Sequence, residues 1–428
     1  MRESRQWSKL DNAAKIFPPT SGRRDTKVFR FSCELYEQVD PELLQSALDR
    51  TLTQFPLYKS ILKKGLFWYY FETSALRPVV REEDSPPCGP MYSADRKNLL
   101  FEVTYFQRRI NLEVYHALAD GTGALHFLRT LVFYYLCKKH GIPQSGAAID
   151  YDASQAQKQR DSFYAYYSKG KMPRPPKTQK AYRLRGERYS EYRIGVIEGR
   201  MSAGRVLEEA RSHGATLSEY LAAVLIVSIH EGMTVAEAER PVVLTVPVNL
   251  RRFFPSVSAR NFFGVINVGY AFAGRDAGFE AVLASVKASF QEQLEPGLVR
   301  ERMNRLGALE HNFAAKLVPL VLKDLVLKAA NRLVQQEITA SFSNVGRVQM
   351  PEEVARHIRL FDILCSTGRL QTCLCSYGDD LMVSFTSPFL NTDPQRAFFR
   401  FLTGLGIPVE ITASLPGEEE EVPHEELS

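Results

Sequence analysis

With 428 residues, the chain is longer than a single hydrophobic core usually supports, so its length predicts two domains. The hydrophobic share of 45% and the charged share of 24% are those of a globular protein, and a net charge of +5 is too small to indicate nucleic-acid binding. The sequence opens without a secretory signal pattern, its longest apolar stretch, 221–229, is too short to cross a bilayer, and its six cysteines form no disulfide framework. We therefore expect a cytoplasmic protein without a transmembrane segment.

The first half of the chain, residues 1–150, alternates predicted strands and helices. A helix is expected over Pro41 to Gln54, because Asp40 is a good N-cap and proline fits the first turn. A longer helix is expected over Thr122 to Lys139, where apolar residues recur at helical spacing and Gly141 follows as a stop signal. The expected strands are Val28–Tyr36, Leu66–Phe71, Leu99–Phe106 and Arg109–Tyr115. This alternation predicts an N-terminal domain of mixed α/β type.

The segment 151–190 differs in composition from its neighbours. From residue 152 to residue 188 it contains ten lysines and arginines against three acidic residues, with three prolines in the middle. We expect a basic, solvated crossover linker between two domains, and a surface that binds phosphates or an acidic partner is the alternative. The last residues, 415–428, contain six glutamates and no aromatic residue, so we expect an acidic disordered tail.

The second half, residues 191–414, again mixes helices and strands and predicts a C-terminal domain. Thr216, with Glu219 three residues later, forms a capping box and predicts a strongly apolar helix that ends at His230. The other expected helices are Ala203–His213, Gly278–Gln293, Arg302–Gln335 and Asp393–Gly404. The expected strands are Tyr192–Met201, Val242–Pro247 and Gly264–Phe272, followed by a meander of Ile358–Ile363, Leu370–Ser376 and Leu381–Ser387.

One part of the long predicted helix has an unusual distribution of polar residues. Residues 318–334 are apolar around most of the helix, and the polar residues Lys323, Asp324, Lys328 and Arg332 lie along one side. This pattern favours a helix in the core of the protein. A helix that lies on a membrane surface is the alternative.

The most informative segment is His116-Ala117-Leu118-Ala119-Asp120-Gly121, which joins a predicted strand to a predicted helix. Loops held between rigid elements often carry catalytic side chains, and histidine suits proton transfer near neutral pH. A buried structural histidine is the alternative for His116. Asp120 could orient the imidazole or cap the helix that follows. Gly121 is expected to meet a backbone requirement, either a positive φ or the close approach of a substrate.

This His-x-x-x-Asp-Gly pattern resembles the active-site motif of the chloramphenicol-acetyltransferase-like superfamily, which includes alcohol acetyltransferases and nonribosomal peptide condensation domains. Many members have two adjacent histidines, and Tyr115 replaces the first here. Residues 247–255 and 260–264 look like the central block of the bacterial alcohol acetyltransferase branch, and residues 7–18 look like its N-terminal opening. Residues 341–346 lie where the superfamily has its second, structural motif, although they depart from the usual form.

The resemblance implies two α/β sandwich domains with an active-site tunnel at their interface. It also implies that His116 is the catalytic base and that Asp120 pairs with an arginine to hold the loop, although the sequence does not identify that arginine. Asn249 and Asn344 are candidates for lining the tunnel, with turn asparagines as the alternative. Arg251 and Arg252 are candidates for phosphate contacts, with paired surface arginines as the alternative.

We therefore expect an acyltransferase that moves an acyl group from coenzyme A, or a related thioester, to an alcohol, with His116 as general base and no covalent acyl-enzyme. The alternatives are a condensation-type enzyme that joins substrates bound to an acyl carrier protein, and a non-catalytic binding protein with the same fold. No Gly-x-Ser-x-Gly, Walker or Gly-x-Gly-x-x-Gly pattern occurs, which argues against a serine hydrolase and against nucleotide-binding enzymes. His116, Asp120 and His126 offer too few ligands for a metal site, so none is expected.

Overall fold

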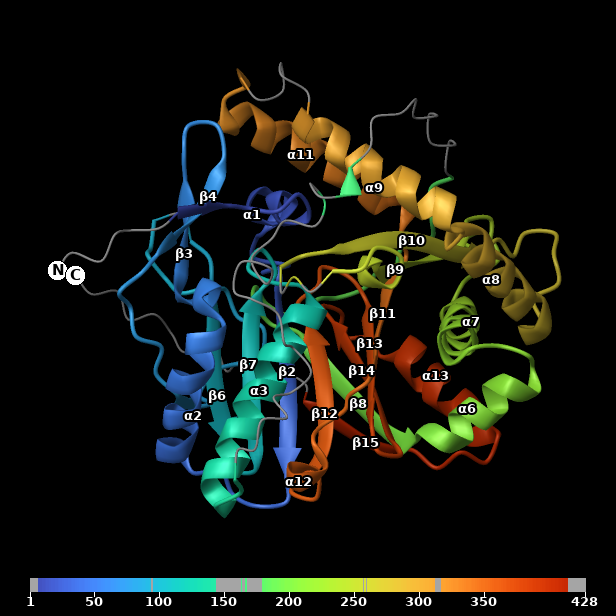
Figure 1. The fold of residues 1–428 in the computed structure, drawn as a ribbon. Coiled ribbons are helices and arrows are strands. Elements are labelled where there is room, and N and C mark those ends of the chain that lie inside the picture. Colours follow the sequence, from blue (N-terminus) through green and yellow to red (C-terminus); the bar gives the residue numbers. More distant parts are fainter. Residues whose placement is uncertain are drawn as a thin grey trace, which may run out of the picture.

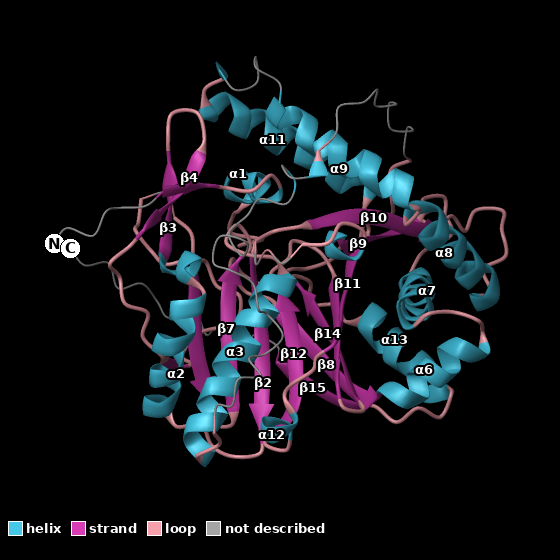
Figure 2. Ribbon diagram, in the orientation of Figure 1, coloured by secondary structure: helices cyan, strands magenta, loops and turns pink. Residues whose placement is uncertain are grey.

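The computed structural model describes residues 7–93, 95–143, 163, 166, 167, 179–256, 258, 260–311 and 317–414. Two β-sheets stand next to each other at the centre of the molecule, and helices cover their outer sides (Figure 1 and Figure 2). The mixed α/β architecture expected from the sequence is confirmed.

The first sheet has five strands in the order β12-β2-β7-β6-β5. They are β12 (Ile358–Cys365), β2 (Val28–Leu35), β7 (Arg109–Tyr115), β6 (Phe101–Phe106) and β5 (Arg81–Glu82). Helices α2 (Pro41–Gln54) and α3 (Gly121–His140) pack together on one side of this sheet (Figure 1). The predicted caps are confirmed, because the Asp40 side chain accepts hydrogen bonds at the start of α2 and Gly141 has a φ of 64° after α3.

The second sheet has seven strands in the order β10-β9-β11-β13-β14-β8-β15. They are β10 (Phe263–Tyr270), β9 (Val242–Asn249), β11 (Ala340–Arg347), β13 (Gln371–Tyr377), β14 (Asp380–Ser387), β8 (Gly195–Ser202) and β15 (Glu410–Ser414). Helices α6 (Ala203–Ser212), α7 (Leu217–His230), α8 (Phe279–Gln293) and α13 (Asp393–Gly404) cover its outer side (Figure 1). The capping box of Thr216 and Glu219 at the start of α7 is confirmed.

The predicted three-stranded meander near the C-terminus was wrong in its first strand. The strands β13 and β14 pair with each other as expected, but β12 crosses to the first sheet and pairs with β2. Strand β12 has buried apolar residues on both of its faces, and Asp362 within it is also buried. The hydrophobic pattern of residues 358–363 identified this strand but not the strand that pairs with it, because any strand of matching length offers the same backbone hydrogen-bonding groups.

A small third sheet, with the order β1-β4-β3, lies beside the first and consists of β1 (Trp7–Lys9), β4 (Tyr69–Thr73) and β3 (Ser60–Lys64). The strand predicted over 66–71 was therefore misplaced. Residues 66–68 form the turn of the β3–β4 hairpin, where Gly65 donates a backbone hydrogen bond to the carbonyl of Trp68. The exposed apolar side chains of Leu66 and Trp68 gave this turn the appearance of a buried strand.

The long helix predicted over 302–335 is two helices, α9 (Pro296–His311) and α11 (Leu320–Val334), and residues 312–316 lie outside the described part. The expectation that 318–334 forms a core helix was wrong. Only Leu320 and Asp324 of α11 are buried, and most of its apolar side chains face outward. Figure 1 shows α11 lying across the top of the molecule beside α1 (Phe17–Thr20).

Most of the basic segment 151–190 and all of the acidic tail 415–428 lie outside the described residues, so the predicted linker, tail and domain boundaries stay predictions. Among the described residues, no single helix has both the length and the apolar character needed to cross a membrane. Helices α6 and α7 reach those limits only when taken together, across a bend of 84°.

Candidate active site

His116 lies where strand β7 ends and the chain turns toward helix α3. Its backbone N–H donates a hydrogen bond of 2.8 Å to the carbonyl of Lys27, which immediately precedes β2. Lys27 has a positive φ of 60°, a conformation that costs energy for any residue other than glycine. A strained backbone position therefore contacts the histidine directly, as is common at functional sites.

Three aromatic rings surround the imidazole of His116. The ring of Phe17 stacks on it, with centroids 4.4 Å apart and planes inclined by 19°. The ring of Phe29 meets it edge-on at 4.9 Å, and the ring of Phe263 lies 5.6 Å away. These rings come from α1, β2 and β10, so elements from both halves of the chain form the apolar surroundings of the histidine.

These surroundings favour the neutral form of His116. Burial lowers the pKa of the imidazole, because few groups around it can stabilise a positive charge, while the nearby Asp120 and Asn261 oppose the shift. Two buried polar atoms at this position have no hydrogen-bond partner among the described residues, namely Nδ1 of His116 and Oδ1 of Asn261. A neutral histidine with an unused ring nitrogen can accept a proton from a molecule bound beside it.

Asp120 does not hydrogen-bond to the imidazole, and both of its oxygens are occupied elsewhere. Its Oδ1 accepts a hydrogen bond of 2.9 Å from the N–H of Gly123, which caps helix α3. Its Oδ2 accepts one of 2.8 Å from the N–H of Phe262 and one of 2.8 Å from Nη1 of Arg251. The carboxylate therefore joins the start of α3 to the loop that precedes β10.

Arg251 is the cationic partner of Asp120, and both side chains are almost fully buried. Its guanidinium also donates to the carbonyls of Ser258 at 2.9 Å and of Arg260 at 2.6 Å. These bonds hold the loop before β10 against the His116 turn. Since its N–H groups already point at protein oxygens, Arg251 has little capacity left for the phosphate contact that the sequence suggested.

The two asparagines hold backbone and side-chain groups near the same region. Asn249 donates from Nδ2 to Oγ1 of Thr122 at 3.2 Å and accepts from the N–H of Arg251, so it joins the end of β9 to the start of α3. Asn344 donates to Oγ of Ser218 at 2.9 Å and accepts from the N–H of Gly346, which has a φ of 90°. Asn344 thus stabilises an irregularity in β11, and neither contact tests whether the two residues line a tunnel.

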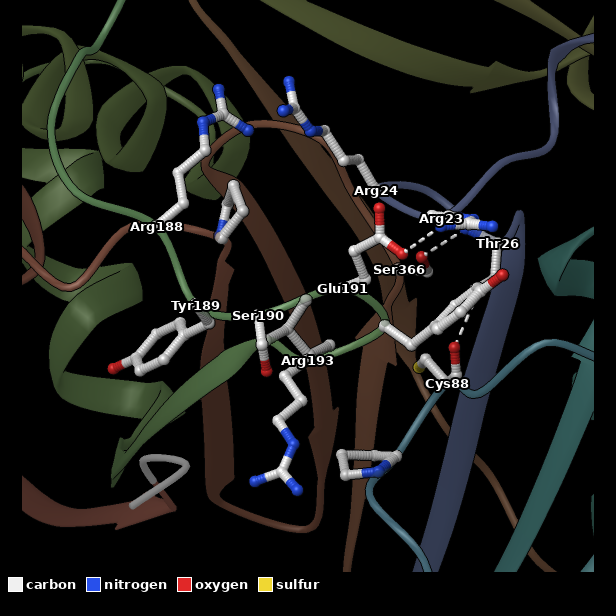
Figure 3. Close-up of a pocket in the computed structure, with 14 residues that line it drawn as sticks. Arg23, Arg24, Thr26, Cys88, Arg188, Tyr189, Ser190, Glu191, Arg193 and Ser366 are labelled. Atoms are coloured by element: carbon white, nitrogen blue, oxygen red, sulfur yellow. Dashed lines mark hydrogen bonds and ion pairs between the residues drawn. The ribbon is translucent and has the colours of Figure 1, made fainter. Parts of the chain in front are cut away.

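A pocket with a volume of about 180 Å³ lies next to the start of β2, and His116 itself is not among its lining residues. Thr26 lies in its wall, one residue before the Lys27 carbonyl that holds His116, and Arg23, Arg24, Arg188 and Arg193 also line it. Figure 3 shows Arg24 and Arg188 extending to the same side of the pocket, whereas Arg193 points the other way. Glu191 neutralises Arg23 through an ion pair of 2.8 Å.

Arg188 is held in place by two contacts. Its guanidinium lies 4.4 Å from the centre of the Phe389 ring, and it donates to the carbonyl of Gly368. Its pKa is lowered first by burial and then by the positive charges of Arg24 and Arg183. An excess of positive charge at the mouth of a pocket favours an anionic ligand.

One group of described residues could offer metal-ligand atoms, and it lies at the far end of α3 from His116. The atoms belong to Glu37, His140 and His357 and lie within 4.8 Å of one another. The two imidazole rings stack at 3.7 Å with planes only 14° apart, and Lys139 lies 3.5 Å from the Glu37 carboxylate. Ring nitrogens bind metals in the plane of the ring, so two stacked rings beside a lysine are poorly arranged to hold one ion.

Searches of protein-family models and of curated proteins gave no match for this chain. Solved structures do match along almost its whole length. A structure of TRI101 from F. graminearum, complexed with coenzyme A and deoxynivalenol, superposes with a TM-score of 0.62 at 10% identity and covers 96% of this chain and 100% of its own. Polyketide synthase associated protein 5 from Mycobacterium tuberculosis gives 0.58 at 14% identity, covering 93% of this chain and 97% of its own.

The first condensation domain of the CDA synthetase is also similar, with a TM-score of 0.55 at 16% identity, and covers 95% of this chain and 97% of its own. The chain shares the fold of these acetyltransferase and condensation-domain structures. The fold expected from the sequence is thereby confirmed, with two lobes that correspond to the two central sheets.

Within this fold, the segments that suggested the resemblance converge at one place. Phe17 belongs to the N-terminal segment 7–18, and Asn261, Phe262 and Phe263 belong to the segment 260–264, yet all four lie around the His116–Asp120 turn. The individual roles of Asn261 and the aromatic rings were missed. The available signal was their place in those segments, because their residue types alone do not indicate a site.

The structure also shows the surroundings of Gly121 and Arg252. Gly121 does not have a positive φ, and a Cβ there would meet only Phe31 at an ordinary 3.9 Å, so that part of the expectation was wrong. Close approach of a substrate to Gly121 stays a prediction. Arg252 is exposed on the short 3-10 helix Leu250–Arg252, and its contact with phosphate also stays a prediction.

Proposed function

We propose that the protein transfers an acyl group from coenzyme A, or from a related thioester, to the hydroxyl of an alcohol, with His116 as general base. The observation that carries the proposal is the environment of His116, a buried imidazole at a strand end whose Nδ1 has no hydrogen-bond partner among the described residues and whose neutral form is favoured by burial. The similarity in fold to TRI101, whose structure contains coenzyme A and deoxynivalenol, supports the choice of reaction class.

In the proposed reaction, the imidazole of His116 takes the proton of the acceptor hydroxyl as its oxygen attacks the thioester carbonyl. The C–S bond of the resulting tetrahedral intermediate then breaks, and the imidazolium returns the proton to the leaving sulfur. The products are an ester and a free thiol, and the histidine ends in its starting state. The apolar rings around His116 exclude water, which limits hydrolysis of the thioester.

Direct transfer is favoured over an acyl-enzyme because no reactive thiol is present among the described residues. All six cysteines are free, and five are buried. Burial raises the pKa of the Cys365 thiol to about 12 and raises the pKa of the Cys373 and Cys375 thiols. Thiols that stay protonated at neutral pH are poor nucleophiles.

We assign the anionic end of the thioester donor to the arginine-lined pocket. Arg24 and Arg188 extend to one side of it, and the pocket wall is one residue from the carbonyl that holds His116. Arg24→Ala should raise KM for acyl-CoA about fivefold to tenfold, as expected for the loss of one charge-assisted contact, with little change for an acyl-pantetheine thioester that lacks the nucleotide. An equal rise in KM for both donors would show that the phosphates of the donor bind elsewhere on the protein.

The second candidate is condensation of substrates bound to a carrier protein, favoured by the similarity to the condensation domain and to the polyketide synthase associated protein. Its donor would present a phosphopantetheine arm, and the carrier would be an acidic protein. Activity with acyl-carrier protein but not with acyl-CoA, measured at equal donor concentrations, would favour this candidate over the first.

The decisive experiment is turnover of acetyl-CoA with a panel of alcohols, detected by release of free thiol. His116→Ala should lower turnover by about 10²–10⁴-fold, the usual cost of removing a general base. His126→Ala, which removes a histidine from the adjacent helix α3, is the matched control and should retain turnover. A folded His116→Ala protein with wild-type turnover would exclude His116 as the base.

A further inference from the structure

Helix α11 is inverted relative to an ordinary surface helix. Its inward side carries Asp324, which accepts a hydrogen bond of 2.8 Å from the hydroxyl of Tyr69, and Lys323, which donates one of 2.9 Å to the carbonyl of Phe67. The outward side carries apolar residues, and the side chains that are half or more exposed are Val321, Leu322, Leu325, Val326, Leu333 and Val334. A surface helix normally buries its apolar stripe and exposes its polar residues.

The apolar surface continues from α11 onto the neighbouring β3–β4 hairpin. The N–H of Leu320 donates to the carbonyl of Leu66 at 2.9 Å, so the start of α11 is joined to the hairpin turn. Leu66 and Trp68 in this turn have 72% and 43% of their surfaces exposed. Figure 1 shows the hairpin and α11 on the same side of the molecule. Contiguous exposed apolar surface of this kind marks an interaction site.

Four exposed basic residues lie beside this surface. Lys328 and Arg332 lie on one flank of α11, and Lys64 and Lys9 lie on the adjoining strands. Asp324 is the one acidic residue of the helix, and it is buried between Tyr69 and Lys64. An apolar face with a basic flank and an exposed tryptophan is typical of helices that lie in the interface of an anionic membrane.

We propose that the outward face of α11, together with the turn of the β3–β4 hairpin, docks on the surface of an anionic phospholipid bilayer. The helix lies in the plane of the interface, its leucines and valines enter the acyl boundary, and its lysine and arginine contact lipid headgroups. A second copy of this chain fits the surface less well, because a symmetric contact would bring the two basic flanks together.

Docking would also orient the proposed active site. Helix α11 packs on α1, whose Phe17 stacks on the imidazole of His116. The bilayer would therefore lie on the side of the molecule nearest the histidine, where apolar alcohols or long acyl chains partition from the membrane. This consequence rests on the proposed function, whereas the docking itself does not and is measured without any substrate.

The test is flotation of the full-length chain with vesicles of phosphatidylcholine alone or of phosphatidylcholine mixed with phosphatidylglycerol. The wild-type chain should float with the anionic vesicles, and its binding should weaken as salt is added. The chain has two tryptophans, so Trp7→Phe leaves Trp68 as the single reporter, and its emission should shift to the blue on binding. Failure of the wild-type chain to bind anionic vesicles at low salt would overturn the proposal.

Substitutions separate the apolar contribution from the charged one. Leu322→Gln combined with Val326→Gln should lower vesicle partitioning by at least about tenfold, because two apolar side chains no longer enter the lipid. Val235→Gln changes a valine that is 91% exposed in the loop after α7, and this matched control should bind like the wild type. Lys328→Glu combined with Arg332→Glu should lower binding to anionic vesicles by about tenfold and leave binding to neutral vesicles unchanged.

Two outcomes would contradict membrane docking even if some vesicle binding occurred. Wild-type binding by the Leu322→Gln and Val326→Gln chain, with an unchanged melting temperature, would place the membrane contact elsewhere. A dimer that these same substitutions dissociate, found by light scattering in a wild-type chain that does not bind vesicles, would make α11 a contact between copies of this chain.

Discussion

Asp120→Asn tests whether the carboxylate beside His116 holds the loop or takes part in proton transfer. Asparagine keeps the oxygen that caps helix α3, so the hydrogen bond from Gly123 can persist. It removes the negative charge that faces Arg251, and it replaces Oδ2, which accepts from both Arg251 and Phe262, by an amide nitrogen that cannot accept. The buried guanidinium would then lie without its counter-charge.

The expected loss of stability follows from this burial. The side chains of Arg251 and Asp120 are only 10% and 6% exposed, and removing one partner of a buried ion pair costs about 3–5 kcal/mol. The carbonyls of Ser258 and Arg260 still accept from Arg251, which offsets part of the loss. We expect a decrease of roughly 3 kcal/mol in the free energy of unfolding, measured by urea titration followed by circular dichroism.

Two further variants make the measurement specific. Asp379→Asn is the matched control, since Asp379 also accepts a backbone N–H, that of Gly204, but is exposed, and it should cost less than about 1 kcal/mol. Adding Arg251→Gln to Asp120→Asn should recover part of the loss, because no unpaired charge remains. An unchanged urea midpoint for Asp120→Asn, together with turnover reduced by more than about 10²-fold, would refute the loop-holding role and support direct action on the imidazole.

Burial lowers the pKa of His116, so the acidic limb of kcat/KM should have its midpoint below the usual histidine value of about 6.5; a midpoint above 7, absent from the His116→Ala profile, would contradict the burial. Double-reciprocal plots of the initial rate against thioester and alcohol concentration should intersect, and intact-mass spectrometry after mixing with the donor alone should show unmodified protein. Parallel plots together with a stable acyl adduct on a cysteine would instead indicate covalent catalysis. Burial, with the neighbouring Asp362, raises the pKa of Glu198 to about 9. The folded protein then keeps a proton that the unfolded chain releases above about pH 4.5, so the free energy of unfolding should fall as the pH rises from about 4.5 to about 9. Glu198→Gln should flatten this dependence of the unfolding free energy on pH, measured by urea titrations at several pH values. An unchanged dependence would show that other groups cause it.

The sequence predicted local structure well where the signal is local. Asp40, Gly141 and the pair of Thr216 and Glu219 act within one helical turn, and the helix ends that they predicted are confirmed. The errors arose where the outcome depends on distant partners. Strand β12 could not be paired from its own residues, and α11 reads as a core helix because apolar periodicity does not state which face meets the protein.

The candidate site shows the same division. The motif placed His116 and Asp120 at one turn, but Arg251 lies 131 residues further along the chain, and only the fold shows that it meets Asp120. The sequence offered Arg251 as a phosphate contact, since an exposed and a buried arginine look alike in a sequence. Asn261 had no signal of its own, because its proximity to the imidazole depends on the path of the loop before β10.

The position of β12 has a consequence for how this protein can be made and divided. Phe31 pairs with Ile363, so the first sheet lacks its last strand until nearly all of the chain has left the ribosome. A fragment that stops near residue 150 would leave the backbone N–H and C=O groups along the β12 side of β2 unpaired, and such an open edge favours aggregation. Supplying a peptide of residues 356–367 to such a fragment should rescue its solubility. In the full-length chain the two lobes should unfold as one cooperative unit, because β12 comes from the second half of the sequence and pairs in the first sheet.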